Sequence, residues 1–302
     1  MRGDAVNAAL LLLPDFLLIA LGAALSRSRQ FDAGFWAGLE RLVYFVLFPA
    51  LLFRSLAASP RDFADAGTLA LVGVGFTLAG IALSALAHPL FRLPHPTFAA
   101  CFQCGFRFNT YVALAAAARI GGTDAVAAMS LLVGLLVPLV NVVAVTMLVR
   151  GNGAAIVLAV ARNPLVIACV LGIAWHALGI PLPTVAGRIL ELTAAAALPL
   201  GLLAVGAGLR PAGAALPLPP LAYWLAVKLL AVPAVALALS RVLDVPALER
   251  QVAVALAAVS TAPSAYILAV QMRANGAAAS LLISAGTLAA ALTLPLWIAL
   301  AA

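Results

Sequence analysis

The stretch CFQCGFRFNTYVALA (residues 101–115) decides how this chain is interpreted, because it places polar side chains in the middle of a long apolar segment. Hydrogen-bonding groups occur there at Gln103, Arg107, Asn109, Thr110 and Tyr111. In a hydrophobic environment such groups cost free energy unless they are paired or functional, and a charged arginine at the centre of a membrane helix costs about 3 kcal/mol. The stretch therefore predicts an interrupted helix whose polar residues form a site.

The composition indicates that lipid, not water, surrounds most of the chain. The 302 residues are 66% hydrophobic and 9% charged, whereas a soluble domain carries about 25% charged residues. Apolar runs of about 20 residues separated by short connectors are typical of an all-α polytopic membrane protein. We expect about ten transmembrane helices, at residues 6–26, 35–57, 66–88, 97–119, 124–149, 155–178, 184–209, 217–240, 249–273 and 277–301.

The net charge of +7 does not indicate a nucleic-acid partner. The arginines stand mostly singly in the connectors, and no basic cluster with interleaved aromatic residues occurs. Single basic residues at the ends of membrane helices anchor them to lipid headgroups. We therefore expect the lipid bilayer, and no nucleic acid, as a partner.

The two halves of the chain resemble one another at a nearly constant offset. LLPDFLLIALG, ending at Gly22, aligns with RNPLVIACVLG, ending at Gly172, and Pro49 aligns with Pro199. Residues 1–151 and 152–302 would then each hold five helices, and tandem units with an odd number of spans cross the membrane in opposite senses. Such inverted repeats are a hallmark of secondary transporters. Both termini would lie on one side of the membrane, and the nearly balanced arginine distribution leans towards the outer side.

A second polar interruption occupies the matching position of the second half, in VSTAPSAYILAVQ (residues 259–271). Pro263 lacks an N–H group and should break the helix, and neighbouring hydroxyls can satisfy the freed carbonyls. Paired interrupted helices are a sequence indication of a transporter's binding site. The candidate substrate-binding residues are Gln103, Arg107, Asn109, Thr110, Tyr111, Thr261, Ala262, Pro263, Ser264 and Tyr266.

The chemistry of this site favours an anion. The second half of each broken helix directs its positive N-terminal end at the middle of the membrane, and Arg107 adds a guanidinium that suits a carboxylate. For each candidate the structural alternative remains open: Asn109 and Thr110 as interhelical hydrogen-bonding groups, the tyrosines as core residues, and Arg107 as a donor to helix carbonyls.

Three further polar residues are candidates for coupling or for supporting the site. Lys228 would neutralise a helix C-terminus, reach an interface or take part in coupling, and Asn141 and Gln271 would support the site. No central Asp or Glu is expected near the breaks, which argues against a cation/proton antiporter. The chain has no catalytic or phosphate-binding motif, and the Cys101/Cys104 pair reads as buried packing, so no enzyme activity, metal or cofactor is expected.

FRFNTYVALA (residues 106–115) and STAPSAYILAVQM (residues 260–272) resemble the paired signatures of the bacterial auxin efflux carrier family. The resemblance extends over the whole chain and includes LFPALLF around Pro49 and VKLLAVP around Lys228. It implies a fold similar to sodium/proton antiporters and bile-acid symporters, with broken helices 4 and 9 crossing and an elevator-type movement of a transport domain against a scaffold. The plant members have a proline where this chain has Asn109–Tyr111, and a long central loop that is missing here.

These observations predict a secondary or potential-driven transporter of small organic anions, such as auxin-like or malonate-like carboxylates, in a bacterial inner membrane. Proton or sodium coupling stays open, and the resemblance admits a homodimer. Two alternatives remain: a sodium-coupled symporter of the bile-acid type, and a membrane sensor or scaffold that transports nothing. Sodium-dependent uptake would identify the first, and indifference to Asn109→Ala the second.

Overall fold

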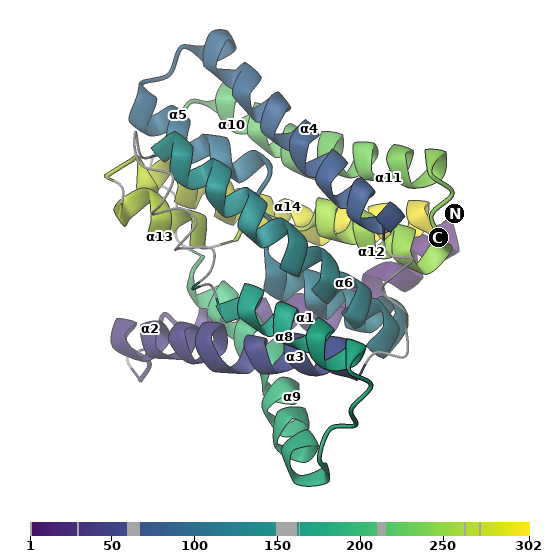
Figure 1. The fold of residues 1–302 in the computed structure, drawn as a ribbon. Coiled ribbons are helices and arrows are strands. Elements are labelled where there is room, and N and C mark those ends of the chain that lie inside the picture. The colour runs from purple at the N-terminus through teal and green to yellow at the C-terminus, as the bar shows by residue number, and fades with distance from the viewer. Residues whose placement is uncertain are drawn as a thin grey trace.

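The computed structural model describes residues 2–28, 30–58, 67–148, 162, 164–209, 216–262, 264–271 and 273–302. Within these residues every regular element is a helix, as expected (Figure 1). The first half contains α1 (Arg2–Leu25), α2 (Ala33–Leu42), η1 (Val43–Leu47), α3 (Phe48–Ala57), α4 (Gly67–Phe91), α5 (His95–Phe102), η3 (Gln103–Gly105) and α6 (Thr110–Leu148). The second contains α8 (Pro164–Ala177), α9 (Thr184–Ala207), α10 (Leu218–Ala226), η4 (Val227–Ala231), α11 (Val232–Val242), α12 (Ala247–Ala258), α13 (Ser264–Gln271) and α14 (Gly276–Ala301).

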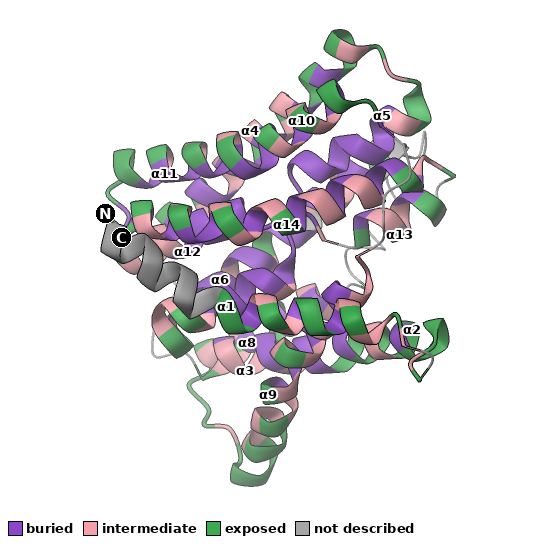
Figure 2. Ribbon diagram, turned by 180° about the vertical axis from the view of Figure 1, so that it is seen from behind, coloured by how far each residue is buried: buried purple, intermediate pink, exposed green. Residues whose placement is uncertain are grey.

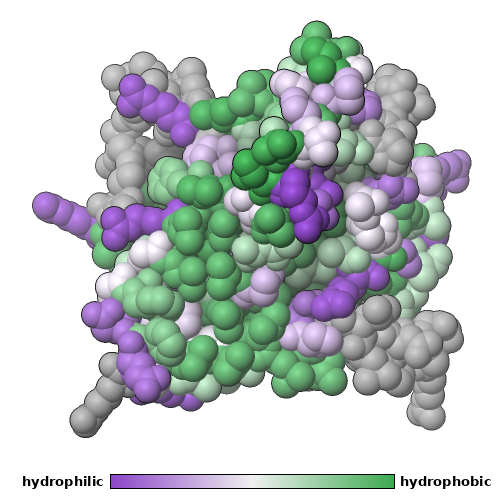
Figure 3. Space-filling model, turned by 90° about the horizontal axis from the view of Figure 1, so that it is seen from below, coloured by the Kyte–Doolittle hydropathy of each residue, from purple (hydrophilic) through white to green (hydrophobic). Residues whose placement is uncertain are grey.

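The exterior of the molecule is that of a membrane protein. Six helical segments in the described part of the chain are long and apolar enough to cross a bilayer: Ala33–Ala57, Gly67–Phe91, His95–Ala144, Thr184–Ala207, Leu218–Val242 and Gly276–Ala301. Many leucines on these helices are exposed, and Figure 2 shows exposed positions along the outer sides of the helices. The face seen from below is largely hydrophobic, with most hydrophilic side chains towards its margins (Figure 3). Water would solvate such a surface poorly, so the polytopic membrane fold is confirmed. The count of ten and the inverted repeat remain predictions.

The helices form two groups that meet along α6. In the first group, called here the α1/α9 group, α1 packs on α9, and α3 packs on α8 and α9. In the second, the crossover group, α12 packs on α6, α11 and α14, and α4 packs on α11. Figure 1 shows the α1/α9 group below and the crossover group above, with α6 running between them. The contacts of α1 with α14 and of α3 with α6 join the two groups.

Two proline residues explain the two π-helical turns. Pro49 follows η1 and Pro233 follows η4, each at the second position of the next α-helix. A proline cannot donate to the carbonyl four residues earlier and its ring displaces that carbonyl. The preceding turn therefore widens into a π-bulge while the helix continues, and such bulges are frequent at functional sites.

α6 contains the connector that the sequence analysis placed between the fourth and fifth spans. Its backbone leaves the helical conformation at Gly121 and Gly122, and Gly122 has a φ of 57°. That value lies in the left-handed region, which glycine adopts without a steric penalty. The interruption at Gly121 and Gly122 therefore divides α6 into two helical parts.

Candidate functional site

The first predicted break is present. α5 and the short turn η3 end at Gly105, and α6 begins at Thr110. Asn109 caps α6: its Oδ1 accepts hydrogen bonds from the backbone N–H groups of Tyr111 (3.1 Å) and Val112 (3.4 Å). An Asn side chain at this position satisfies N–H groups that have no partner within the helix, which explains why the helix restarts here.

The second predicted break is present too. α12 ends at Ala258 and α13 begins at Ser264. Val259 is extended, with φ −65° and ψ 152°. Pro263, to which the sequence analysis attributed the break, lies outside the described residues. Ala262 accepts a hydrogen bond from the N–H of Ala265 (3.0 Å), which forms the first turn of α13.

The two breaks contact one another, so the helices cross at their interruptions. The backbone N–H of Asn109 donates to the carbonyl of Ser260 at 2.8 Å. The Thr261 hydroxyl donates to the carbonyl of Cys104 at 2.6 Å, and Gln103 Nε2 donates to the carbonyl of Ala265 at 3.2 Å. Each broken helix thus supplies hydrogen-bonding partners for polar groups of the other. Non-helical backbone inside a membrane protein requires such partners. The sequence predicts hydroxyl groups as partners of the freed carbonyls, and Thr261 is such a partner across the crossing.

Arg107 is buried at the crossing and bridges the two broken helices. Its Nη1 donates to Gln103 Oε1 and its Nη2 to Ser264 Oγ, both at 3.2 Å. Both partners are neutral. Within the described residues no carboxylate pairs with Arg107, so its positive charge stands uncompensated in a buried position.

Asn109 also carries an unused donor. The residue is 1% exposed, and its Nδ2 has no hydrogen-bond partner in the described part of the chain. Leaving such a group unpaired costs about 1–3 kcal/mol. A ligand with an acceptor oxygen would remove this cost.

Lys228 places a second buried cation beside the second break. It lies in η4, is 4% exposed, and its Nζ donates to the carbonyl of Ala257 at 2.8 Å. Ala257 is in the last turn of α12, where carbonyls lack helical partners and the helix end is negative. Of the interpretations offered for Lys228, neutralisation of a helix C-terminus is the one that this contact matches.

The remaining candidates are distributed around the crossing. Thr110 is the buried first residue of α6, and Tyr111 stacks on Phe48 with ring centroids 4.4 Å apart. Tyr266 is partly buried and its ring lies beside Gly276 at the start of α14. Asn141 is partly buried on the second part of α6. The side chain of Gln271 lies outside the described residues.

Two polar groups at or near the site were not identified from the sequence. The Thr287 hydroxyl of α14 donates to the carbonyl of Ile283 at 2.8 Å and is hydrogen-bonded to the Ser260 hydroxyl at 3.0 Å, so it supports the second break. Asp15 of α1 is buried and shares a small cavity with Val112, in the first turn of α6. The expectation of no carboxylate near the breaks was therefore wrong. Asp15 could have been identified from the sequence, since it interrupts an apolar run.

The three cysteines are buried and free, and for Cys101 and Cys104 burial agrees with the packing interpretation. The described residues contain no group of three or more His, Cys, Asp or Glu side chains that could hold a metal ion.

Interrupted helices inside an all-helical membrane fold are typical of membrane transport proteins. A family model described as "Membrane transport protein" matches residues 147–298, and the chain belongs to this family, the auxin efflux carrier family. The family is one of transporters and not of enzymes. The chain is therefore an integral membrane transporter, which implies a bilayer and a transported solute. No curated protein matched it.

Proposed function

We propose that this chain transports small organic anions and binds them at the crossover of the two broken helices. The observation that carries the proposal is the buried, uncompensated positive charge of Arg107 at the crossing. Lys228 adds a second buried cation whose described partner is a neutral carbonyl. Buried charges are costly without a counter-charge, and a carboxylate solute would supply one.

Asn109 would supply the directional contact. Its Oδ1 already caps α6, so the N–H groups of Tyr111 and Val112 are engaged. The group left to donate is Nδ2, which is buried without a partner among the described residues. An anion at the start of α6 would accept from Nδ2 and gain from the positive helix end. The other candidate residues would surround the bound anion: Gln103, Thr110, Tyr111, Thr261, Ala262, Pro263, Ser264 and Tyr266. Asn141 and Gln271 would support them.

Alternating access would follow from the two helix groups. The hydrogen bonds across the crossing tie the broken helices to each other, so they would move as one unit with the crossover group against the α1/α9 group. This would be an elevator-type movement. Residues 1–151 and 152–302 would be the two inverted repeats of the transporter, and each would contribute helices to both groups. A bacterial inner membrane would provide a driving force, since its potential supplies about 2.3 kcal/mol per charge per 100 mV for outward movement of an anion.

Binding and transport of defined probes test the proposal. Malonate and indole-3-acetate would be added to the purified protein in detergent and to proteoliposomes, with and without sodium. The decisive variant is Asn109→Ser, because serine retains a capping oxygen for α6 but removes the amide donor. The control is Asn275→Ser at the cap of α14, where Asn275 accepts from the N–H of Ala278 and, unlike Asn109, also donates from its amide to Thr97 Oγ1 at 3.1 Å.

We expect a concentration-dependent thermal shift and uptake of a probe by the wild type and by Asn275→Ser, and at least a tenfold weaker affinity in Asn109→Ser. Sodium-dependent uptake would favour the bile-acid type of symport instead. A folded wild type that binds and moves neither probe would overturn the anion assignment. Equal effects of the two serine variants would show that the crossover is not the binding site.

A further inference from the structure

Asp15 is an acidic residue in the interior of a membrane-spanning helix. It lies midway along α1 within the apolar run LLLLPDFLLIALG, and its side chain is 10% exposed. A carboxylate in such a position is expensive in lipid and usually belongs to an ion or proton pathway. The proposed anion site does not use it.

The two carboxylate oxygens of Asp15 have different surroundings. Oδ1 accepts from Arg119 Nη2 at 3.4 Å, a long contact for an ion pair. Oδ2 is buried and has no hydrogen-bond partner among the described residues. Asp15 lines a cavity of about 10 Å³ together with Phe16, Ile19, Val112 and Leu294, no larger than about one water molecule. Asp15 therefore combines a buried acceptor oxygen that has no described partner with a neighbouring space too small for an organic solute.

The lining of this cavity selects the cation that Asp15 could take. The other four side chains are hydrocarbon and offer no oxygen ligands. Metal cations such as Ca²⁺ and Mg²⁺ need several oxygen ligands, and the same holds for other hard cations. A proton needs a single oxygen. The geometry is consequently suited to a proton and unsuited to a sodium ion.

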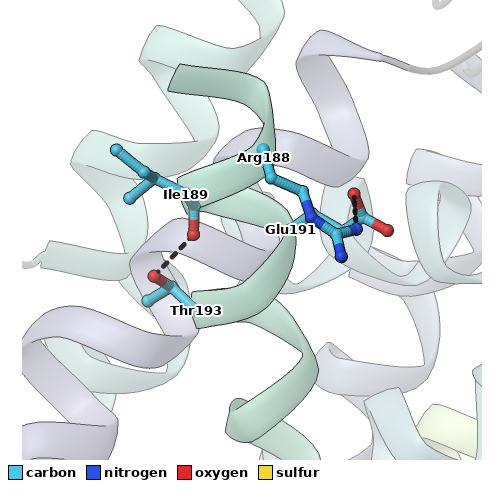
Figure 4. A network of polar contacts seen from close by, with 4 residues as sticks. All are labelled: Arg188, Ile189, Glu191 and Thr193. Carbon is cyan, nitrogen blue, oxygen red and sulfur yellow. Dashed lines mark hydrogen bonds and ion pairs between the residues drawn. The ribbon is translucent and has the colours of Figure 1, made fainter. Parts of the chain in front are cut away.

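Arg119 is the charged group that pairs with Asp15. The other charged residue of α6, Asp124, follows the interruption at Gly121 and Gly122, and α14 contains no charged residue. On α9, Arg188 and Glu191 pair with each other at 3.0 Å (Figure 4).

That α9 pair lies far from Asp15 along the helices. α1 and α9 run antiparallel, with Gly22 against Leu203 and Ile19 against Gly206. The beginning of α9 is therefore remote from the position of Asp15 on α1. On α1 itself, Arg2 and Asp4 lie in the first turn of the helix. Among the described residues, Arg119 thus dominates the electrostatic environment of Asp15.

The Asp15–Arg119 pair also connects the two helix groups. Asp15 belongs to the α1/α9 group, and Arg119 lies on the same part of α6 that Asn109 caps. The Arg119 side chain is 44% exposed, so the pair extends from the buried cavity to the surface. A change in the charge of Asp15 would alter a contact between α1 and the helix that starts at the crossover.

We propose that Asp15 is a proton-binding site that couples proton movement to transport. A proton from water binds Oδ2, the carboxylate becomes neutral, and the contact with Arg119 loses its ionic attraction. α6 is then free to move relative to α1. When the proton leaves, the ion pair forms again. The transport part of this inference rests on the proposed function, whereas proton binding by Asp15 does not.

Infrared difference spectroscopy of the purified protein tests proton binding without any solute. Acidification should produce the carbonyl stretching band of a protonated, buried carboxyl group. The band should be absent in Asp15→Asn, present in the control Glu191→Gln, and already present at neutral pH in Arg119→Gln, which removes the counter-charge. A band that persists in Asp15→Asn, or no band in the wild type, overturns the proposal. Arg119→Gln keeps the test valid if Asp15→Asn does not fold.

Proteoliposomes test the coupling, with malonate as the probe and a pH-sensitive dye inside. A pH gradient should drive malonate accumulation in the wild type and Glu191→Gln, and at least tenfold less in Asp15→Asn. If the wild type moves no probe, the proposed function fails and the infrared result stands alone. If the wild type moves malonate but Asp15→Asn responds to pH in the same way, the coupling role of Asp15 is wrong.

Discussion

The backbone N–H of Asn109 donates to the carbonyl of Ser260 at 2.8 Å, and this bond joins the two interrupted helices at the point where both leave helical geometry. The residues are far apart in the chain but face the same requirement. Inside a bilayer, each freed backbone group needs a partner in the protein. At the crossing, each helix therefore provides hydrogen-bonding partners that the other helix lacks.

The Thr261 hydroxyl should contribute measurably to stability. Thr261→Val keeps the shape of the side chain but leaves the buried carbonyl of Cys104 without its 2.6 Å donor. An unsatisfied buried acceptor costs about 1–3 kcal/mol. We expect a lower unfolding temperature in detergent, measured by intrinsic fluorescence.

Thr193→Val is the matched control for that variant. Thr193 donates at 2.8 Å to Ile189 within α9 (Figure 4), whose carbonyl belongs to the same helix. A change at this partly exposed position should stay within about 0.5 kcal/mol. Equal destabilisation by the two valine variants would show that the contact across the crossing adds nothing.

Arg107 carries a positive charge and a planar guanidinium group that donates two hydrogen bonds, and two variants separate these roles. Arg107→Lys retains the charge but cannot hold Gln103 and Ser264 with one planar group, whereas Arg107→Gln removes the charge. We expect both variants to melt at lower temperature, but the affinity for malonate to fall at least tenfold, or about 1.4 kcal/mol, only in Arg107→Gln. Calorimetric titration measures this. An equal loss of affinity in both variants would mean that malonate binding depends on the planar guanidinium group and not on the charge.

Much of the crossing could be predicted from local sequence. The polar cluster around Asn109 interrupts an apolar run, and so does the hydroxyl-rich stretch around Thr261. Such an interruption is visible in the sequence without knowledge of the fold. The turn at Gly121 and Gly122 was predicted for a similar reason, because glycine pairs interrupt helices. Where the signal is a break in a local pattern, the sequence is sufficient.

The partners of these groups could not be predicted. The contact of Lys228 with Ala257 and the contact of Asp15 with Arg119 join residues on different helices, and no periodicity specifies which helices become neighbours. Asp15 was visible as an acidic residue in an apolar run, but its importance depends on the packing of α1 against α6 and α14. The π-helical turns at η1 and η4 follow from Pro49 and Pro233 only once the helices are known to continue through them.

Lys228 should affect anion binding more than it affects stability. Lys228→Gln keeps a donor for the Ala257 carbonyl and removes the charge, while Lys228→Met removes both. A buried charge without a counter-charge is itself costly, so its removal should cost little stability. We expect both variants to fold, with Lys228→Met the less stable, and both to bind malonate several-fold more weakly. Wild-type affinity in Lys228→Gln would restrict Lys228 to capping α12.

The close approach of α1 to α9 depends on glycine, and it provides a test of the α1/α9 group. A Cβ atom added to Gly206 would fall on the carbonyl oxygen of Ile19 and lie 2.8 Å from the backbone nitrogen of Ala23. Backbone atoms cannot move aside as a flexible side chain can, so the two helices would have to separate. Overpacking of this kind costs about 1–3 kcal/mol, which exceeds the gain of about 1 kcal/mol that alanine brings to a helix.

Gly206→Ala should therefore lower the unfolding temperature, and Gly38→Ala should leave it unchanged or raise it. Gly38 lies in α2, and a Cβ atom there would meet no heavy atom within 4 Å. The two variants make the same chemical change in two helices, so their difference isolates the helix contact from helix propensity. If Gly206→Ala were as stable as Gly38→Ala, α1 and α9 would not be held together at this point, and the α1/α9 group could not serve as the fixed side of the proposed movement.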